Sequence, residues 1–504
     1  MEHITKRFGS VIANNDINLE LHEGEILSLL GENGSGKTTL MNMLSGIYYP
    51  DEGQIYVHGE PVTIASPKDA YDNHIGMIHQ HFKLVDVFTA AENIILGLEG
   101  EGKFDMAVVN QKVLEICEKY GFDIRPDMKI YDMSVSQKQT VEIVKVLYRG
   151  ADILILDEPT AVLTPQETDK LFQIMRNMKA DGKSLIIITH KLHEVLDVSD
   201  RVVILRKGQY IGDVATKDAS QQSLTDMMVG RSVSLNISRP KAESVKERIL
   251  VEHLTVKDKE GVKKLDDVSF EAFGGEILGI AGVAGSGQKE LLESIAGLQK
   301  LEHGSKITYV DPDGKRIEIN GMDPLDIINK GILLNFVPED RFGMGLSGSM
   351  NINENVMLRT FRRGKSPLLD KKFPADVADK IVYELEVVTP NTNKIPLRRL
   401  SGGNVQKILV GREISCDPTV LMTAYAVRGL DINTSYTIYN LLTEQKMKGV
   451  AVIYVGEDLD VLLELCDRLV VLCGGQVSGI VDARNITKEE VGLLMTKHRK
   501  GDAE

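Results

Sequence analysis

Short runs of consecutive apolar residues alternate along the chain with longer stretches whose apolar residues recur at helical spacing. Residues 26–30, 153–156 and 184–188 form such runs, which are typical of strands buried on both faces of a parallel sheet. Residues 112–119 and 167–178 have the spacing of amphipathic helices. This alternation predicts an α/β fold with a largely parallel core sheet.

The same pattern occurs twice. The tetrapeptide GEIL at residues 24–27 recurs 251 residues later, and DRVVIL at residues 200–205 recurs as DRLVVL 267 residues later. A repeat of this length indicates two homologous domains, with additional residues inside the second copy. We predict domains at residues 1–237 and 248–504, joined by a polar linker at residues 238–247.

A glycine-rich stretch follows the first apolar run. It fits the pattern G-x-x-x-x-G-K-[ST] and precedes a predicted helix at residues 40–46, which is the strand–loop–helix context that a phosphate-binding loop requires. Backbone N–H groups and the helix N-terminus favour a polyphosphate there. We expect Lys37 to reach the β- and γ-phosphates of a nucleotide and the Thr38 hydroxyl to bind Mg²⁺. The predicted nucleotide-binding residues of this loop are Gly31, Glu32, Asn33, Gly34, Ser35, Gly36, Lys37, Thr38 and Thr39.

Acidic residues follow another buried strand of the first copy. Asp157 and Glu158 lie where α/β sheets bind ligands, at the carboxyl end of a strand. We expect Asp157 to bind Mg²⁺ and Glu158 to polarise the water that attacks the γ-phosphate. His190 ends the next strand, and Gln80 follows an apolar run and is predicted to contact both Mg²⁺ and the water. Taken singly, His190 also fits a helix cap and Gln80 an exposed loop.

Composition narrows the class of protein. The net charge is −14 and the isoelectric point is near 5.4, which argues against general nucleic-acid binding. No apolar run approaches the roughly 20 residues of a membrane helix, and the N-terminus does not resemble a signal peptide. The cysteines lack the spacing of zinc ligands, which favours free thiols in a reducing compartment. We therefore expect a cytosolic chain that acts at a membrane only through a partner. The cysteines are Cys117, Cys416, Cys466 and Cys473.

These motifs, together with LSGGN at residues 400–404, make the chain resemble the ATP-binding subunit of an ATP-binding cassette (ABC) importer. The resemblance covers essentially all of the chain and points to the tandem form used for simple sugars and nucleosides. It implies two P-loop ABC domains, each with a mainly parallel core sheet, an antiparallel subdomain and a helical subdomain. It also implies ATP and Mg²⁺ as cofactors. In this family the glycines of LSGGN open a helix that caps the γ-phosphate bound by the opposite domain, here Ser401, Gly402, Gly403 and Asn404.

The two copies are unequal. The second keeps an intact cap, whereas the first reads SVSQ at residues 134–137, without a glycine. Because domains of this family pair head to tail, the intact loop would meet the intact cap, giving one competent composite site and one degenerate site. In the degenerate site, Gln288 replaces Lys37, Lys289 replaces Thr38, Ala424 replaces Asp157, Tyr425 replaces Glu158, Glu457 replaces His190 and Glu339 replaces Gln80, while Gly282, Gly285, Ser286 and Gly287 retain the loop.

The first predicted strand carries one more candidate. We expect Phe8 to stack on adenine, with ordinary core packing as the alternative reading. The counterpart in the second copy, near Asp258, is not aromatic. Aligning the copies places Met1 opposite Val251, so the first strand looks shorter than its counterpart, for which a start codon assigned too late is one explanation.

The resemblance also implies partners. In the family, a groove beside the Gln80 loop accepts helices of two integral-membrane permease subunits, and the apolar residues 82–88 suit such a contact, although a locally buried loop is the alternative. The permease would in turn serve an extracellular solute-binding lipoprotein. This predicts a peripheral protein on the cytoplasmic face of the membrane, with no nucleic-acid partner.

The sequences HQHFKLVDVFTAAENI and PTAVLTPQE resemble those of the nucleoside-importing branch more than those of the sugar importers. A simple-sugar importer remains the alternative. Tandem ABC proteins that act on ribosomes or in DNA repair fit less well, because the linker is short, the sites are unequal and zinc-binding cysteine insertions are missing. A pseudo-enzyme that only binds ATP also fits less well, because Lys37, Asp157, Glu158 and His190 are all present.

Overall fold

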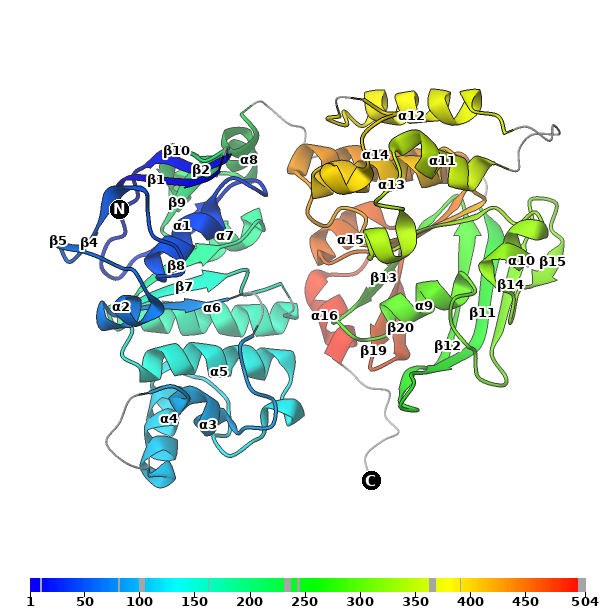
Figure 1. Cartoon of the computed structure of the whole chain (residues 1–504). Coiled ribbons are helices and arrows are strands. Elements are labelled where there is room, and N and C mark those ends of the chain that lie inside the picture. The colour runs from blue at the N-terminus through cyan, green and yellow to red at the C-terminus, as the bar shows by residue number, and fades with distance from the viewer. Residues whose placement is uncertain are drawn as a thin grey trace. The chain divides into compact units, whose positions relative to one another are not determined.

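The chain forms two compact units, Met1–Ser234 and Leu235–Glu504 (Figure 1). The division lies within a few residues of the predicted end of the first domain. The computed structural model describes residues 1–9, 11–79, 82–98, 105–161, 163–230, 237–242, 245–361, 369–389 and 391–496 of the 504-residue chain.

The first unit is built on a six-stranded sheet. In spatial order its strands are β10 (Gln209–Ala215), β9 (Arg201–Arg206), β3 (Ile26–Leu30), β8 (Ser184–Ile188), β7 (Ile153–Asp157) and β6 (Ile75–Ile78). Neighbouring strands are parallel except at the edge, where β10 is antiparallel to β9. All five residues of the central strand β3 are buried, as expected for a strand covered on both faces. The predicted parallel core sheet is confirmed.

A second, antiparallel sheet covers one part of this unit. Its strands, in spatial order, are β2 (Val11–Ile17), β1 (Glu2–Phe8), β4 (Glu52–Val57) and β5 (Glu60–Val62). The helices are α1 (Lys37–Leu44), α2 (Pro67–Asp72), α3 (Ala90–Ile95), α4 (Met106–Tyr120), α5 (Val135–Tyr148), α6 (Pro165–Ala180), α7 (Leu192–Val198) and α8 (Gln221–Val229). The sequence places the first helix at residues 40–46, which is wrong at both ends. It begins three residues earlier because Gly36, with φ 99°, ends the loop in a left-handed cap.

Alternate residues of the core strands face two hydrophobic clusters. On one face, Leu185 and Ile187 of β8 join a cluster that includes residues of α3, α4 and α5. On the other face, Ile186 and Ile188 join a cluster that includes α1 and the antiparallel sheet. The helical and antiparallel subdomains therefore pack on opposite faces of the same core sheet.

The second unit repeats this plan. Its core strands, in spatial order, are β16 (Leu334–Val337), β17 (Val420–Ala424), β18 (Ala451–Val455), β13 (Ile277–Gly282), β19 (Arg468–Cys473) and β20 (Gln476–Asp482). The antiparallel sheet contains β12 (Lys263–Gly274), β11 (Lys246–Lys257), β14 (Lys306–Val310) and β15 (Arg316–Glu318). The helices are α9 (Gln288–Ile295), α10 (Pro324–Asn329), α11 (Ile352–Thr360), α12 (Lys372–Glu384), α13 (Gly402–Ile414), α14 (Ile432–Met447), α15 (Leu459–Leu465) and α16 (Lys488–Thr496).

The end of the predicted first domain and the start of the predicted linker pack onto the second unit. Ile237, predicted as the last residue of the first domain, belongs to the second unit's hydrophobic core. The Arg239 guanidinium donates to the carbonyls of Leu463 at 2.7 Å and Cys466 at 2.6 Å. Residues 237–239 are therefore held by the second unit. Within the described ranges, no helix has both the length and the apolar character needed to cross a membrane.

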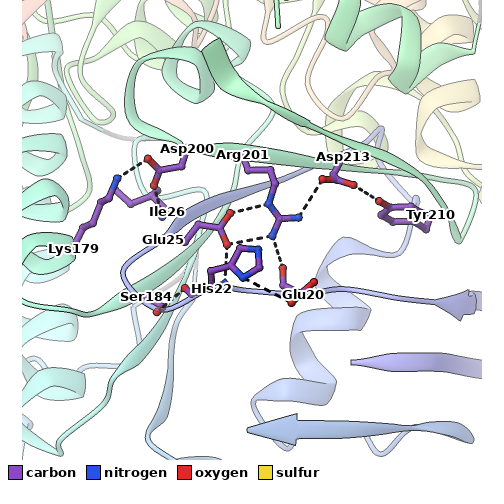
Figure 2. Close-up of polar contacts among 10 residues, drawn as sticks. All are labelled: Glu20, His22, Glu25, Ile26, Lys179, Ser184, Asp200, Arg201, Tyr210 and Asp213. Atoms are coloured by element: carbon purple, nitrogen blue, oxygen red, sulfur yellow. Dashed lines mark hydrogen bonds and ion pairs between the residues drawn. The ribbon is translucent and has the colours of Figure 1, made fainter. Parts of the chain in front are cut away.

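A polar network fixes β3 to β9 in the first unit (Figure 2). The Glu25 carboxylate, 8% exposed, accepts hydrogen bonds from Arg201 Nε at 2.8 Å and from the His22 N–H at 2.8 Å. Arg201 also pairs with Asp213 at 3.3 Å. Asp200, the residue before β9, accepts from the Ile26 N–H at 2.9 Å and from Lys179 Nζ at 2.5 Å (Figure 2).

The second unit contains the same network at the repeated positions. Arg468 pairs with Glu276 at 2.9 Å, and Lys446 pairs with Asp467 at 2.8 Å. Asp467 accepts from the N–H of the first residue of β13 at 2.9 Å. In both units, buried charge-assisted hydrogen bonds thus set the register of the strand that leads into the phosphate loop.

We expect Arg201→Met to lower the free energy of opening β3 by about 2–4 kcal/mol, because it leaves the buried Glu25 carboxylate without its cation. Hydrogen exchange of the β3 amides in the full chain measures this loss. Arg468→Met should give a similar loss in β13. Lys170→Met removes an exposed pair with Asp123 and should cost less than about 1 kcal/mol. If the β3 amides of Arg201→Met were protected from exchange as well as in wild type, the Glu25–Arg201 pair would not be what holds β3 in place.

Candidate functional site

The glycine-rich loop of the first unit joins β3 to α1, as predicted. A Cβ on Gly36 would lie 2.5 Å from the Ala13 carbonyl oxygen, so the loop fits against the β1–β2 hairpin only with glycine there. Lys37 Nζ is turned into the loop and donates to the carbonyls of Gly31 at 2.6 Å and Glu32 at 3.0 Å. Burial lowers the pKa of the Lys37 ammonium, opposed by neighbouring carboxylates. The loop therefore holds a buried cation beside backbone N–H groups that suit an anion.

The other loop residues differ in exposure. Ser35 is buried, and its hydroxyl has no hydrogen-bond partner within the described residues. Asn33, Gly34 and Thr38 are exposed, whereas Thr39 is half-buried. A buried hydroxyl that has no partner among the described residues, beside the exposed residues Asn33 and Gly34, is an arrangement that a bound polar ligand would satisfy.

The acidic residues meet the histidine at the ends of neighbouring strands. Asp157 is the last residue of β7 and pairs with Ile188 of β8, so Glu158 and His190 follow side by side. Glu158 Oε1 lies 2.9 Å from His190 Nδ1. The other oxygen, Oε2, is buried and has no partner among the described residues. Glu158 adopts a left-handed backbone with φ 48°, an uncommon conformation that clusters at functional sites.

Asp157 is electrostatically unusual. Burial raises its pKa to about 6, the neighbouring Glu158 carboxylate adds to the rise, and Lys37 opposes it. Its carboxylate and the Thr38 hydroxyl are hard oxygen ligands, which suit Mg²⁺ shared with phosphate groups and water. The described residues contain no cluster of three or more His, Cys, Asp or Glu side chains able to hold a metal alone.

The structure describes Phe8 but not Gln80. Phe8 at the end of β1 is 44% exposed and makes an edge contact with Tyr48, with ring centres 5.2 Å apart, so it is not a core residue. Gln80 lies outside the described residues. In the segment that follows it, Leu84 packs on the helical subdomain whereas Val87 is 64% exposed. The segment is therefore partly buried and partly open.

The second unit keeps the backbone of the loop and changes its chemistry. Gly285 and Gly287 have φ values of 86° and 98°, close to the 80° and 99° of Gly34 and Gly36. Gln288 Nε2 donates to the carbonyls of Gly282 at 2.8 Å and Val283 at 3.2 Å, which is the place that Lys37 Nζ occupies in the first unit. Ser286 is buried like Ser35, and exposed Lys289 stands where Thr38 stands.

An exposed arginine joins two acidic residues of the second unit's site. Arg428 pairs with Glu339 at 2.6 Å and with Glu457 at 3.2 Å, and its guanidinium lies 6.0 Å from the centre of the Tyr425 ring. Burial raises the pKa of Tyr425 to about 12, and both carboxylates add to the rise. Ala424 supplies no metal ligand. No role for Arg428 is predicted from the sequence. Alignment of the two repeats places Arg428 opposite Ala161, and this gain of a charged residue beside the site is the signal that could have identified it.

The predicted cap of the second unit is the N-terminus of α13. The Ser401 hydroxyl accepts from the Asn404 N–H at 3.4 Å. Neither Gly402 nor Gly403 has a positive φ, and a Cβ on Gly403 would find nothing closer than 3.7 Å. Glycine at a helical position costs about 1 kcal/mol relative to alanine. Nothing described in this unit requires the glycine at Gly403.

Both units have the strand–glycine loop–helix arrangement of P-loop domains, and the first places a lysine, two carboxylates and a histidine near its loop, which is typical of a tandem nucleotide-hydrolysing protein. A family model described as "ABC transporter" matches residues 14–161 and 265–423. The chain therefore belongs to the ABC transporter family and is an ATPase of that class, which confirms the predicted fold class and activity.

Three relatives align along nearly the whole chain. The nucleoside import ATP-binding protein NupA of Lactococcus lactis subsp. cremoris (strain MG1363) is 42% identical over 98% of this chain and 97% of that protein. The guanosine import ATP-binding protein NupO of Bacillus subtilis (strain 168) is 42% identical over 100% of this chain and 98% of that protein. The glucose import ATP-binding protein TsgD13 of Haloferax volcanii is 37% identical over 98% of this chain and 95% of that protein.

We expect Asp157→Asn to stabilise the nucleotide-free chain by an amount that grows with pH. The folded-state pKa of about 6 exceeds the ordinary value of 3.8, so folding is penalised increasingly as pH rises from about 4 to 6. Asp157 is partly exposed, and the gain at pH 7.5 should be about 1 kcal/mol, or roughly 2–4 °C in melting temperature. Melting curves in EDTA at pH 4.5 and 7.5 measure it.

Asp169→Asn, on the exposed face of α6, is the control and should shift neither curve. An equal gain in melting temperature for Asp157→Asn at both pH values would show that folding does not raise the pKa of the Asp157 carboxyl. The same variant should also lose much of the additional stabilisation that Mg²⁺ gives in the presence of ATP, because a neutral amide replaces the negatively charged carboxylate that is predicted to bind the metal.

Proposed function

We propose that the chain hydrolyses ATP at one composite site and that this turnover powers nucleoside import through a separate membrane permease. The site would combine the first unit's phosphate loop with residues 401–404 of the second unit. The second composite site, in which the roles of the two units are exchanged, would combine the second unit's loop with the first unit's cap at Ser134 and would be degenerate. The observation that carries the proposal is the distribution of intact parts: the complete loop is in one unit and the glycine cap is in the other.

In the competent site, each first-unit residue has a role that its contacts support. Lys37 would exchange the carbonyls of Gly31 and Glu32 for the β- and γ-phosphates. Glu158 would orient the attacking water through Oε2, which has no partner among the residues that the structure describes, while His190 holds Oε1. Phe8 would stack on adenine through its exposed face.

Mg²⁺ held by Thr38, Asp157 and Gln80 would neutralise charge on the bound phosphates. The protein's own contribution is to keep Thr38 and Asp157 at the ends of two rigid elements, α1 and β7. The raised pKa of Asp157 supports this role, because a nearby cation would restore its charged form.

Gly403 supports the second half of the site. A side chain would fit there within the second unit, so the glycine is explained by an approach from outside that unit. A phosphate cradled by backbone N–H groups at a helix N-terminus needs such close approach. The first unit offers less: Val135 and Ser136 take the corresponding positions, and a closed capping box already engages Ser134 and Gln137.

The permease contact would lie at the segment after Gln80, where Val87 is exposed. A solute-binding lipoprotein would deliver the cargo to the permease, and the chain would be a peripheral protein of the cytoplasmic membrane face. The higher identity to the two nucleoside-type relatives than to the glucose-type relative supports nucleosides as the cargo. A simple-sugar cargo is the second candidate.

We expect Glu158→Gln and Gly403→Asp each to lower ATP turnover at least 100-fold in the chain assembled with its permease, although they lie in different units. The first removes the group that orients water, and the second places a carboxylate where the γ-phosphate would lie. Steady-state phosphate release from the assembled importer measures both.

The mirror substitutions are matched controls. Tyr425→Phe and Ser136→Asp occupy the same positions in the degenerate site and should lower turnover no more than a few-fold. If Gly403→Asp left turnover intact, or if Ser136→Asp were as damaging as Gly403→Asp, the composite-site proposal would be wrong.

Cargo is tested with the complete importer in proteoliposomes, with its binding protein present. We expect guanosine to raise ATP turnover several-fold, whereas D-ribose at the same concentration leaves it unchanged. Glu158→Gln in the same vesicles controls for background phosphatase. Stimulation by D-ribose and not by guanosine would favour the sugar importer instead.

A further inference from the structure

The degenerate positions of the second unit are connected to its intact cap. Arg428 holds Glu339 and Glu457 together, as described above. Arg341, two residues after Glu339, reaches in the other direction. Its Nη1 donates to the Gly402 carbonyl at 3.0 Å, and its Nη2 donates to the carbonyl of Arg428. We call Arg341 and Arg428 the arginine brace.

The brace acts on the first residue of α13. Gly402 opens that helix, and a Cβ there would lie 3.1 Å from Arg341 Nη1, so the guanidinium is in close contact with the cap. Arg341 itself begins a short π-helix, Arg341–Gly345, that is capped by Asp340. The far end of this segment is also tied to α13, because buried Arg412 donates to the Gly345 carbonyl at 2.6 Å.

One connection of α13 is common to both units. Gln406 Nε2 donates to the Ala426 carbonyl at 2.9 Å, and Gln139 Nε2 of α5 donates to the Pro159 carbonyl at 2.5 Å. The brace is an addition to this shared bond. Aligning the repeats places Phe82 opposite Arg341, and the phenylalanine side chain has no group that could donate to a carbonyl.

We propose that Arg341 and Arg428 are positioning residues for ATP turnover: they hold the N-terminus of α13 in place through the positions that have lost hydrolytic chemistry. This inference rests on the composite site proposed above. The degenerate half would then contribute to catalysis in the competent site by fixing its cap, with Glu339 and Glu457 anchoring Arg428.

The physical need for the brace follows from the cap itself. Gly402 and Gly403 are consecutive, and glycine has the largest backbone freedom of any residue. A helix that starts with two glycines frays readily unless other contacts hold it. A displacement of about 1 Å in a catalytic group can cost roughly 100-fold in rate. Guanidinium bonds to the Gly402 carbonyl and to the neighbouring Arg428 carbonyl restrict this motion from outside the helix.

The test compares Arg341→Ala, Arg341→Lys and Arg428→Ala in the importer assembled with its permease. We expect both alanine variants to lower kcat for ATP at least 10-fold with KM changed less than about 2-fold, because the phosphate loop that binds ATP lies in the other unit. Arg341→Lys keeps one donor for the Gly402 carbonyl and should recover part of kcat. Arg316→Ala removes an exposed arginine of β15 that pairs with Glu247 of β11, and it should leave kcat unchanged.

A structural readout accompanies the kinetics. Hydrogen exchange at the first turn of α13 should be faster in Arg341→Ala than in wild type, whereas α5 exchange should be the same. If Arg341→Ala fails to fold, Arg341→Gln and Arg428→Gln decide the question by the same two measurements. Wild-type kcat in the folded variants, or a rise in KM that accounts for the whole loss, would overturn the inference.

The outcome separates this inference from the proposed function. If Gly403→Asp abolishes turnover and the brace variants do not, the composite site stands and the brace does not. If neither Gly403→Asp nor the brace variants affect turnover, the composite site itself is wrong. A loss in both, with normal KM in the brace variants, supports both.

Discussion

The close approach between each phosphate loop and the hairpin beside it is the constraint on which the rest of each unit depends. In the first unit a side chain on Gly36 would meet the Ala13 carbonyl at 2.5 Å, and in the second a side chain on Gly287 would meet the Lys264 carbonyl at 2.6 Å. Both glycines have a positive φ that other residues rarely adopt. The loop geometry is therefore set by backbone packing, independently of whether the loop can assist hydrolysis.

The difference between the units lies in side chains placed on this common backbone. Lys37 and Gln288 donate to corresponding carbonyls, but only lysine carries a charge that phosphates can attract. Glu158 and Tyr425 share a left-handed backbone, with φ 48° and 53°, yet the tyrosine, with a pKa near 12, cannot serve as a base near neutral pH. A strained backbone retained without its base indicates that the conformation belongs to the fold as well as to the chemistry.

Much of this arrangement is predictable because it is local or repeated. Contiguous apolar runs give β3 and β8 with their observed ends, and parallel neighbours place Glu158 beside His190. The predicted start of α1 is wrong because the helix begins at a left-handed glycine, which the pattern of hydrophobic residues does not reveal. The brace could not be predicted: Arg341 and Gly402 are 61 residues apart, and Arg428 and Glu339 are 89 apart. Such contacts depend on how loops from different strands meet, which no periodicity encodes.

A cap made of glycines also limits where stabilising contacts can come from. Side chains on Gly402 or Gly403 would strengthen the helix but would occupy the surface that a phosphate needs. The restraint must therefore come from neighbouring elements, and in this unit the cap is contacted by Arg341, which also donates to the carbonyl of Arg428. Arg428 pairs with both Glu339 and Glu457, which stand opposite Gln80 and His190 of the first unit. If the composite site is as proposed, the same substitutions that remove hydrolytic groups from the second unit also supply the carboxylates that anchor Arg428 beside the cap.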